Sequence, residues 1–203
     1  MVKELARGKR SVVYLCRLNG KLAVKKVEKE NIQAVNRINN EVFWLKKLNK
    51  FKIGPRLYSF KKNYLVCEYI NGKNIIPYLE SVKNPEKVIL EVLKQCRRLD
   101  KLNADKKEMT NPYKHIIVRN NKPVMIDFER TKFSEKPQNV TAFFQFLTSS
   151  RINKILIKKQ ITLNKNKLLN LLKEYKKTYS EKDFKNLIKN LSLSYILIFQ
   201  LLT

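Results

Sequence analysis

The sequence is poor in the residues that build metal and disulfide sites. It has one histidine and three cysteines, Cys16, Cys67 and Cys96, which are widely spaced and form no Cys-x-x-Cys pair. A zinc site is therefore not expected. We interpret the cysteines as small buried hydrophobic residues.

Long hydrophobic runs are also missing. The most apolar stretch, residues 191–202, is shorter than the roughly 20 residues that cross a bilayer, and it is interrupted by serine and glutamine. Charged residues follow Met1 almost at once, without the apolar core of a signal peptide. These features predict a cytoplasmic protein with no membrane contact.

Acidic residues are scarce. Seventeen aspartates and glutamates face 44 lysines and arginines, which gives a formal net charge of +27. Such a surplus opposes compaction and favours polyanionic partners. Charge and size together therefore predict contact with nucleic acid. A lysine-rich genome is an alternative explanation for part of the excess, although it does not explain why acidic residues were not enriched alongside.

The residues that are present predict strands followed mainly by helices. The runs 11–18 and 21–27 flank Asn19-Gly20, a pair that favours a type I′ hairpin turn. Apolar spacings of three and four predict a helix over 31–48. A second hairpin is expected at 57–60 and 64–69, and a linker at 70–73. Beyond the linker we expect a short hairpin at 116–118 and 124–126, and helices at 74–82, 86–102, 140–150, 164–179, 181–190 and 191–202. This order predicts an α+β fold with a strand-rich part, residues 1–69, and a helical part, residues 70–203.

One lysine and one glutamate in the first part are suited to chemistry. Lys25 ends the strand Leu22-Ala23-Val24, and Lys26 is expected to point to the opposite face because side chains alternate along a strand. Glu41 lies near the middle of the predicted helix. The alternatives are a solvated lysine and an ordinary exposed helix residue.

An aspartate in the second part ends another apolar strand. Val124-Met125-Ile126 leads into Asp127, Phe128 and Glu129. An aspartate in this place is suited to bind Mg²⁺ that bridges phosphates. The alternative is an aspartate that caps a turn or a helix.

These elements, in this order, resemble the protein-kinase superfamily over residues 4–150. The closest form is the small atypical branch related to RIO-type kinases, particularly the short archaeal ones. The resemblance implies a two-lobed kinase-like fold with a strand-rich N-lobe and a reduced helical C-lobe. It also implies that the chain binds ATP and Mg²⁺, that Glu41 pairs with Lys25 at the ATP phosphates, and that Asp127 binds the metal.

The resemblance assigns further cofactor-binding positions. Gly8 and Lys9 occupy the place of the phosphate-covering loop, where Gly8 alone remains of the family's glycine pattern. Lys9 or Arg10 could supply charge in place of close backbone approach, although this segment could also be a plain basic turn. Glu68 and Tyr69 stand where backbone groups would meet adenine. Glu129 replaces the glycine of the family's Asp-Phe-Gly element.

The catalytic loop departs most from the family. Counting back from strand 116–118 puts His115 at the metal-binding asparagine position and Thr110 at the base position, and threonine cannot act as a base. Two extra loop residues would put Glu108 there, followed by the apolar Met109. We favour Glu108 as the base and His115 as a ligand of metal or phosphate. Alternatively, His115 only hydrogen-bonds to loop backbone.

The chain has no long activation segment after Arg130 and no Ala-Pro-Glu, which argues against a generic peptide substrate. The resemblance implies an archaeal tRNA kinase that phosphorylates a ribose 2′-hydroxyl, at uridine 47 of tRNA. No DNA specificity is expected. The alternatives are a RIO-like Ser/Thr protein kinase or ATPase in ribosome maturation or a tRNA-modifying complex, and a pseudokinase that binds RNA.

Residues 151–203 form a further basic region, with twelve lysines and arginines against three acidic residues. Leucines at helical spacing, including Leu168 and Leu169, are expected to pack on the core. Lys173, Lys176 and Lys177 then share an exposed face. We expect this face to contact RNA phosphates; the alternative is a solvated face that touches nothing.

Overall fold

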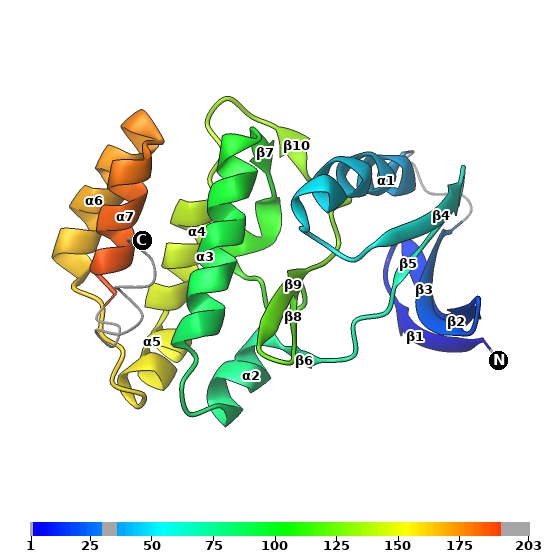
Figure 1. Ribbon diagram of the computed structural model, residues 1–203, viewed down its shortest axis with the longest axis horizontal. Helices are drawn as coiled ribbons and strands as arrows, with labels where there is room; N and C mark the ends of the chain where they lie inside the picture. Colours follow the sequence, from blue (N-terminus) through cyan, green and yellow to red (C-terminus); the bar gives the residue numbers. More distant parts are fainter. Residues whose placement is uncertain (1, 30–35, 192–203) are drawn as a thin grey trace. The chain divides into compact units, whose positions relative to one another are not determined.

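Figure 1 shows the computed structural model of the chain, which describes residues 2–29 and 36–191. Helices and antiparallel strands are both present, so the fold is α+β, as predicted. The chain divides into two compact units. The first unit contains the residues up to 72 together with residues 124–131, and the second contains residues 73–123 and those from 132 onward. This division differs from the predicted one because residues 124–131 join the first unit.

The first unit is built on a five-stranded antiparallel sheet of order β1-β2-β3-β5-β4. The predicted Asn-Gly hairpin is confirmed, with Asn19 at φ 48° and Gly20 at φ 77°. The second hairpin is confirmed as well. β1 was not predicted, because all five of its residues are exposed and no alternation marks it. The strands are β1 (Lys3–Arg7), β2 (Ser11–Leu18), β3 (Lys21–Glu28), β4 (Leu57–Lys61) and β5 (Tyr64–Glu68).

Helix α1 (Arg37–Leu48) packs against β3, β4 and β5. It buries Ile38, Val42, Leu45 and Leu48, as the apolar spacing predicted, and the same face carries the buried Glu41. Residues 30–35 of the predicted helix lie outside the described residues. The helix runs into a short 3-10 helix, η1 (Asn49–Phe51), which ends at Lys52 in a left-handed conformation.

Gly54 follows this turn and fits tightly against residue Phe128. Its φ is +81°, which favours glycine. A Cβ at this position would lie 2.9 Å from the Phe128 ring and 3.0 Å from Leu45 Cδ2. The absence of a side chain therefore allows the segment 124–131 to pack on the end of α1.

The second unit is mainly helical. Helices α2, α3, α4, α6 and α7 match the predicted ranges, whereas α5 was not expected and the predicted helix at 191–202 lies, apart from Leu191, outside the described residues. The helices are α2 (Ile75–Ser81), α3 (Glu86–Lys101), α4 (Asn139–Thr148), α5 (Ser150–Ile157), α6 (Lys165–Thr178) and α7 (Glu181–Lys189). Among the described helices, none is long and apolar enough to cross a membrane.

Short strands and one 3-10 helix connect these helices. They are β6 (Lys73–Asn74), β7 (Ala104–Asp105), η2 (Lys107–Thr110), β8 (Ile116–Arg119), β9 (Lys122–Met125) and β10 (Lys132–Phe133). β6 pairs with β8, and β7 pairs with β10, both antiparallel. The predicted hairpin strands at 116–118 and 124–126 correspond to β8 and β9.

The core of the second unit forms where α4 packs on α3. Val140, Phe143, Phe144 and Leu147 of α4 are fully buried there. On α6 the prediction was partly wrong, because Leu168 is buried while Leu169 is 59% exposed. Of the cysteines, Cys67 and Cys96 are buried, as predicted, and Cys16 is half-buried.

Candidate functional site

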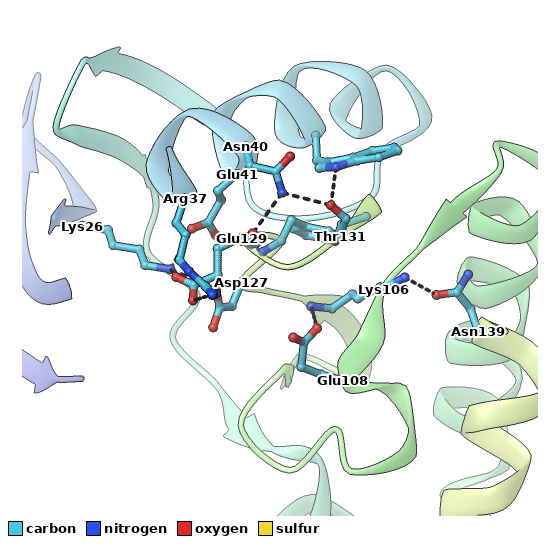
Figure 2. Close-up of polar contacts among 12 residues, drawn as sticks. Lys26, Arg37, Asn40, Glu41, Lys106, Glu108, Asp127, Glu129, Thr131 and Asn139 are labelled. Atoms are coloured by element: carbon cyan, nitrogen blue, oxygen red, sulfur yellow. Dashed lines mark hydrogen bonds and ion pairs between the residues drawn. The ribbon is translucent and has the colours of Figure 1, made fainter. Parts of the chain in front are cut away.

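Three carboxylates of the first unit converge on one lysine (Figure 2). Lys26 Nζ lies 2.7 Å from Glu41 Oε2, 2.9 Å from Asp127 Oδ1 and 2.9 Å from Glu129 Oε2. An ammonium group has three N–H donors, and here each has a carboxylate acceptor. We call Lys26, Glu41, Asp127 and Glu129 the acidic cluster. It joins β3, α1 and the segment that follows β9.

The prediction that Lys25 pairs with Glu41 is wrong, because Lys26 makes this ion pair. Lys25 lies on the other face of β3, with Nζ 4.4 Å from the centre of the Tyr64 ring. The two lysines lie on opposite faces of the strand, as alternation predicts. However, Lys26 rather than Lys25 is on the face of β3 that meets Glu41 of α1.

Glu41 binds both the lysine and the backbone of the aspartate segment. Its Oε1 accepts a hydrogen bond from Phe128 N at 3.1 Å, while Oε2 accepts from Lys26. Burial raises the pKa of the Glu41 carboxyl, Lys26 opposes this rise, and Asp127 adds to it. Burial alone would lower the pKa of Lys26, but Glu41, Asp127 and Glu129 together raise it well above its ordinary value. The lysine is therefore charged throughout the physiological pH range.

Glu129 was regarded in the sequence only as a departure from glycine, yet it is part of the cluster. Its second oxygen, Oε1, accepts from Arg37 Nη1 at 3.2 Å. Asn40 Nδ2 donates to the carbonyl oxygens of Glu129 and Thr131, each at 2.9 Å, and Trp44 Nε1 donates to Thr131 O at 2.8 Å. These contacts from α1 fix the segment after Asp127 (Figure 2). The only feature of the sequence that could have indicated this role is the position of Glu129, two residues beyond Asp127.

Asp127 has the most exposed side chain of the cluster and an unusual backbone. Its side chain is 35% exposed, against 6% for Glu41 and 14% for Glu129. Its φ is 63°, in the left-handed region that aspartate tolerates better than most residues. Strained backbone of this kind occurs often at ligand-binding positions.

The acidic cluster fits a hard divalent cation. One oxygen each from Glu41, Asp127 and Glu129 lies within 4.8 Å of the others. Carboxylate oxygens are the ligands that Mg²⁺ prefers. With Lys26 and Arg37 counted, the site still holds one more carboxylate than cations. This excess of negative charge favours the entry of a further cation.

The predicted catalytic residues Glu108 and His115 lie in the second unit. Glu108 is in η2, its side chain is 9% exposed, and its Oε2 lies 3.5 Å from Nζ of the fully buried Lys106. His115 is half-buried, and its backbone N–H donates to Pro112 O at 2.9 Å. Thr110 is exposed. The buried Lys106 was not singled out in the sequence, where it appears as one of many lysines.

A buried polar network supports the loop that contains Glu108. Asp100, at the end of α3, accepts from Asn139 N at 3.0 Å, from Asn139 Nδ2 at 2.6 Å and from Tyr175 Oη at 2.8 Å. Asn139 in turn binds Ala104 O at 2.7 Å and Lys106 N at 2.9 Å. Burial raises the pKa of Asp100 to about 6, against hydrogen bonds from Asn139 and Tyr175 that lower it.

The remaining predicted positions lie along the sheet of the first unit. Gly8 and Lys9 are exposed in the turn between β1 and β2, where Gly8 N donates to Ser11 O at 2.9 Å. Glu68 ends β5 and Tyr69 follows it, both half-buried. The Glu68 N–H donates to Arg56 O at 2.8 Å, so this amide is already engaged within the sheet.

Comparison with known proteins gives no family to which the chain can be assigned. No protein-family model matches the chain, and no curated protein matches it significantly.

Proposed function

We propose that this chain is an ATP-dependent kinase with a two-lobed kinase-like fold, and that it phosphorylates a ribose 2′-hydroxyl of tRNA. The observation that carries the proposal is the acidic cluster. A strand lysine, a helix glutamate and an aspartate after a second apolar strand meet at one point, although they are far apart in the sequence. Protein kinases use this combination to hold phosphates and metal.

In this proposal, some residues of the acidic cluster bind the metal and Lys26 binds phosphate. Bound Mg²⁺ would neutralise charge on the transferred phosphoryl group. Asp127 and Glu129 offer the more accessible oxygen ligands. When these oxygens engage the metal, Lys26 regains N–H donors, which can then contact phosphate oxygens. The buried Glu41 retains its hydrogen bonds and keeps Lys26 in position.

Glu108 is the proposed acceptor of the hydroxyl proton, and His115 a proposed ligand of metal or phosphate. As the hydroxyl oxygen bonds to the γ-phosphorus of ATP, its proton passes to Glu108, and ADP leaves with the bridging oxygen. The ion pair with Lys106 orients the Glu108 carboxylate. Replacing Glu108 with Gln should then reduce turnover more than replacing the exposed Thr110 with Val.

RNA is the favoured acceptor because of the charge of the chain. A net charge of +27 supplies a surface for a polyanion, and a small metabolite needs no such surface. The second candidate is a RIO-like Ser/Thr protein kinase or ATPase, which the same acidic cluster would serve equally well. A pseudokinase that binds RNA without chemistry is the third.

Labelling by γ-phosphate-labelled ATP separates these candidates. The protein is incubated with Mg²⁺ and either total tRNA or protein extract. Label on a tRNA ribose supports the proposal, label on protein supports the second candidate, and no label with either acceptor contradicts both.

Asp127→Asn is the inactivating variant that tests the role of the acidic cluster in this experiment. Asparagine keeps the size of the side chain and tolerates the left-handed backbone, but it removes the charged metal ligand. The variant should remain folded and lose labelling on the order of a thousandfold. Labelling near that of the wild type would contradict the role of the cluster in phosphoryl transfer.

A further inference from the structure

A pocket of about 300 Å³ lies between α3 and α7, within the second unit. Five basic residues and one acidic residue stand among those that line it: Lys94, Arg97, Arg98, Lys101, Lys185 and Glu181. A lining with this excess of cations is suited to an anion.

Arg97 distinguishes this pocket from a solvated basic surface. It is 6% exposed, which is unusual for an arginine. Its guanidinium lies 5.5 Å from the centre of the Tyr175 ring and 5.9 Å from that of Phe184. Nη1 donates to Tyr175 Oη at 3.3 Å, and Nη2 donates to Tyr179 O. The aromatic rings and these hydrogen bonds hold the guanidinium in one orientation.

The Nε–H of Arg97 is also buried. It has no hydrogen-bond partner in the part of the chain that the structure describes. The nearest carboxylate oxygen, Glu181 Oε2, is 3.6 Å away, beyond good hydrogen-bond distance. A buried donor without an acceptor costs free energy, and the cost is larger for a charged group. An anion that displaced Glu181 from beside Nε would supply the acceptor.

Glu181 is a weak counterion for the Arg97 guanidinium. Its side chain is 51% exposed, and its Oε2 lies 2.8 Å from Lys101 Nζ. Lys94 has a separate partner, since its Nζ lies 3.6 Å from Glu91 Oε1. Arg97, Arg98, Lys101 and Lys185 therefore share a single carboxylate within the lining, and an entering anion would compete with it.

We propose that the pocket between α3 and α7 binds a phosphate group, with Arg97 as its buried donor and Arg98, Lys101 and Lys185 as the cations around it. Arginine suits phosphate because its planar donors match the phosphate oxygens. The group can come from an RNA backbone or from a free phosphate compound. This site is independent of the acidic cluster and of the proposed kinase activity.

Binding of inorganic phosphate to the full chain, measured by calorimetry at constant ionic strength, tests the proposal. Arg98→Gln and Lys101→Gln should each weaken binding about tenfold. Glu181→Gln should strengthen it several-fold, because the competing carboxylate is lost. Lys154→Gln is the matched control, since Lys154 is exposed on α5 and outside the pocket lining. The control should stay within about twofold of the wild type.

A short oligouridylate, used as a second probe, identifies the source of the phosphate. If it is an RNA backbone, inorganic phosphate displaces the oligouridylate and Arg98→Gln weakens both. If it is a free phosphate compound, Arg98→Gln weakens inorganic phosphate alone. The proposal is overturned if the wild type shows no saturable binding of inorganic phosphate, or if the pocket variants and Lys154→Gln bind it equally.

Discussion

Lys26 is the cation that allows three carboxylates to share a small space. Glu41 and Glu129 are largely buried, so each depends on a nearby positive charge. Removing Lys26 would leave these carboxylates facing one another with Arg37 as the cation nearest to Glu129. The lysine therefore contributes to folding before any ligand is bound.

We predict that Lys26→Ala lowers the free energy of unfolding by about 3–5 kcal/mol at pH 7, the range found when one partner of a buried ion pair is removed. The loss should be smaller at pH 4.5, because burial raises the pKa of Glu41 and a neutral Glu41 no longer repels its neighbours. Urea denaturation at the two pH values measures both effects.

Lys25→Ala is the matched control for this prediction. It removes the neighbouring lysine of the same strand, whose contact with Tyr64 is worth about 0.5–1 kcal/mol. Equal destabilisation by the two substitutions would contradict the role assigned to Lys26.

The sequence could predict that one of these lysines meets Glu41, but not which one. Alternation along β3 requires opposite faces and is satisfied by either choice. The answer depends on which face of β3 is covered by α1, and no local pattern in the strand fixes that. Glu129 was missed for a related reason, since its position beside Lys26 is created by α1, which binds the backbone on both sides of it.

At the scale of elements, the turn after α1 sets the position of the aspartate segment. Gly54 accepts the Phe128 ring at a distance that no Cβ would allow. Any side chain at this position must displace either α1 or the residue that follows Asp127.

We predict that Gly54→Ala destabilises the chain by at least about 2 kcal/mol. About 1–2 kcal/mol comes from the left-handed backbone, and overlap with Phe128 adds to it. Gly20→Ala is the matched control, because Gly20 has φ +77° but nothing within 4 Å of a Cβ. It should show the backbone cost alone. Thermal unfolding of both variants measures the difference, and an equal loss would mean that the Phe128 contact yields without cost.

The Asp100 network gives the second unit a pH dependence of a definite sign. Its carboxyl has a pKa of about 6 in the folded state, raised from an ordinary value of 3.8. The folded state therefore binds this proton more tightly than the unfolded state. The resulting stabilisation is present at low pH and is lost as pH rises through 6.

We predict that the free energy of unfolding of the wild type, relative to Asp100→Asn, falls by about 2 kcal/mol between pH 4 and pH 7. The substitution removes the titration while keeping a side chain of the same shape. Denaturant titrations across this range measure the difference. A difference that is constant with pH would show that Asp100 does not titrate in this window.

The longer elements were predictable because local signals mark them. Asn-Gly marks the β2–β3 hairpin, and Asn164 and Ser180 cap the helices α6 and α7 through hydrogen bonds to Lys167 N and Asp183 N. The two-residue strands β6, β7 and β10 carry no such signal. They exist because distant segments pair, as Lys132 does with Asp105, and no local pattern can indicate that.

At the scale of the whole molecule, the charge surplus raises the question of which surface meets a polyanion. Lys173, Lys176 and Lys177 on α6 are exposed, as predicted. Lys177 Nζ lies 2.8 Å from Glu174 Oε1, so its charge is already partly balanced.

We predict that changing Lys173, Lys176 and Lys177 together to Ala lowers the log–log salt slope of tRNA binding by about two. A lysine in the footprint contributes roughly one unit of slope, and Lys177 less because of Glu174. Affinity measured across a salt series gives the slope. The triple variant of Lys83, Lys87 and Lys154 to Ala, all exposed and on other helices or loops of the second unit, controls for charge alone. If both triple variants change the slope equally, α6 has no special role.

The first unit is discontinuous in the sequence, and this sets an order of events during synthesis. Asn40, Glu41 and Trp44 find their partners in residues 127–131, and residues 73–123 must leave the ribosome in between. Until then, the nascent sheet and helix expose a carboxylate and an indole that the folded chain buries. The first unit therefore stays incomplete while residues 73–123 are synthesised. A chaperone would have its greatest effect during this interval, when buried groups are still exposed.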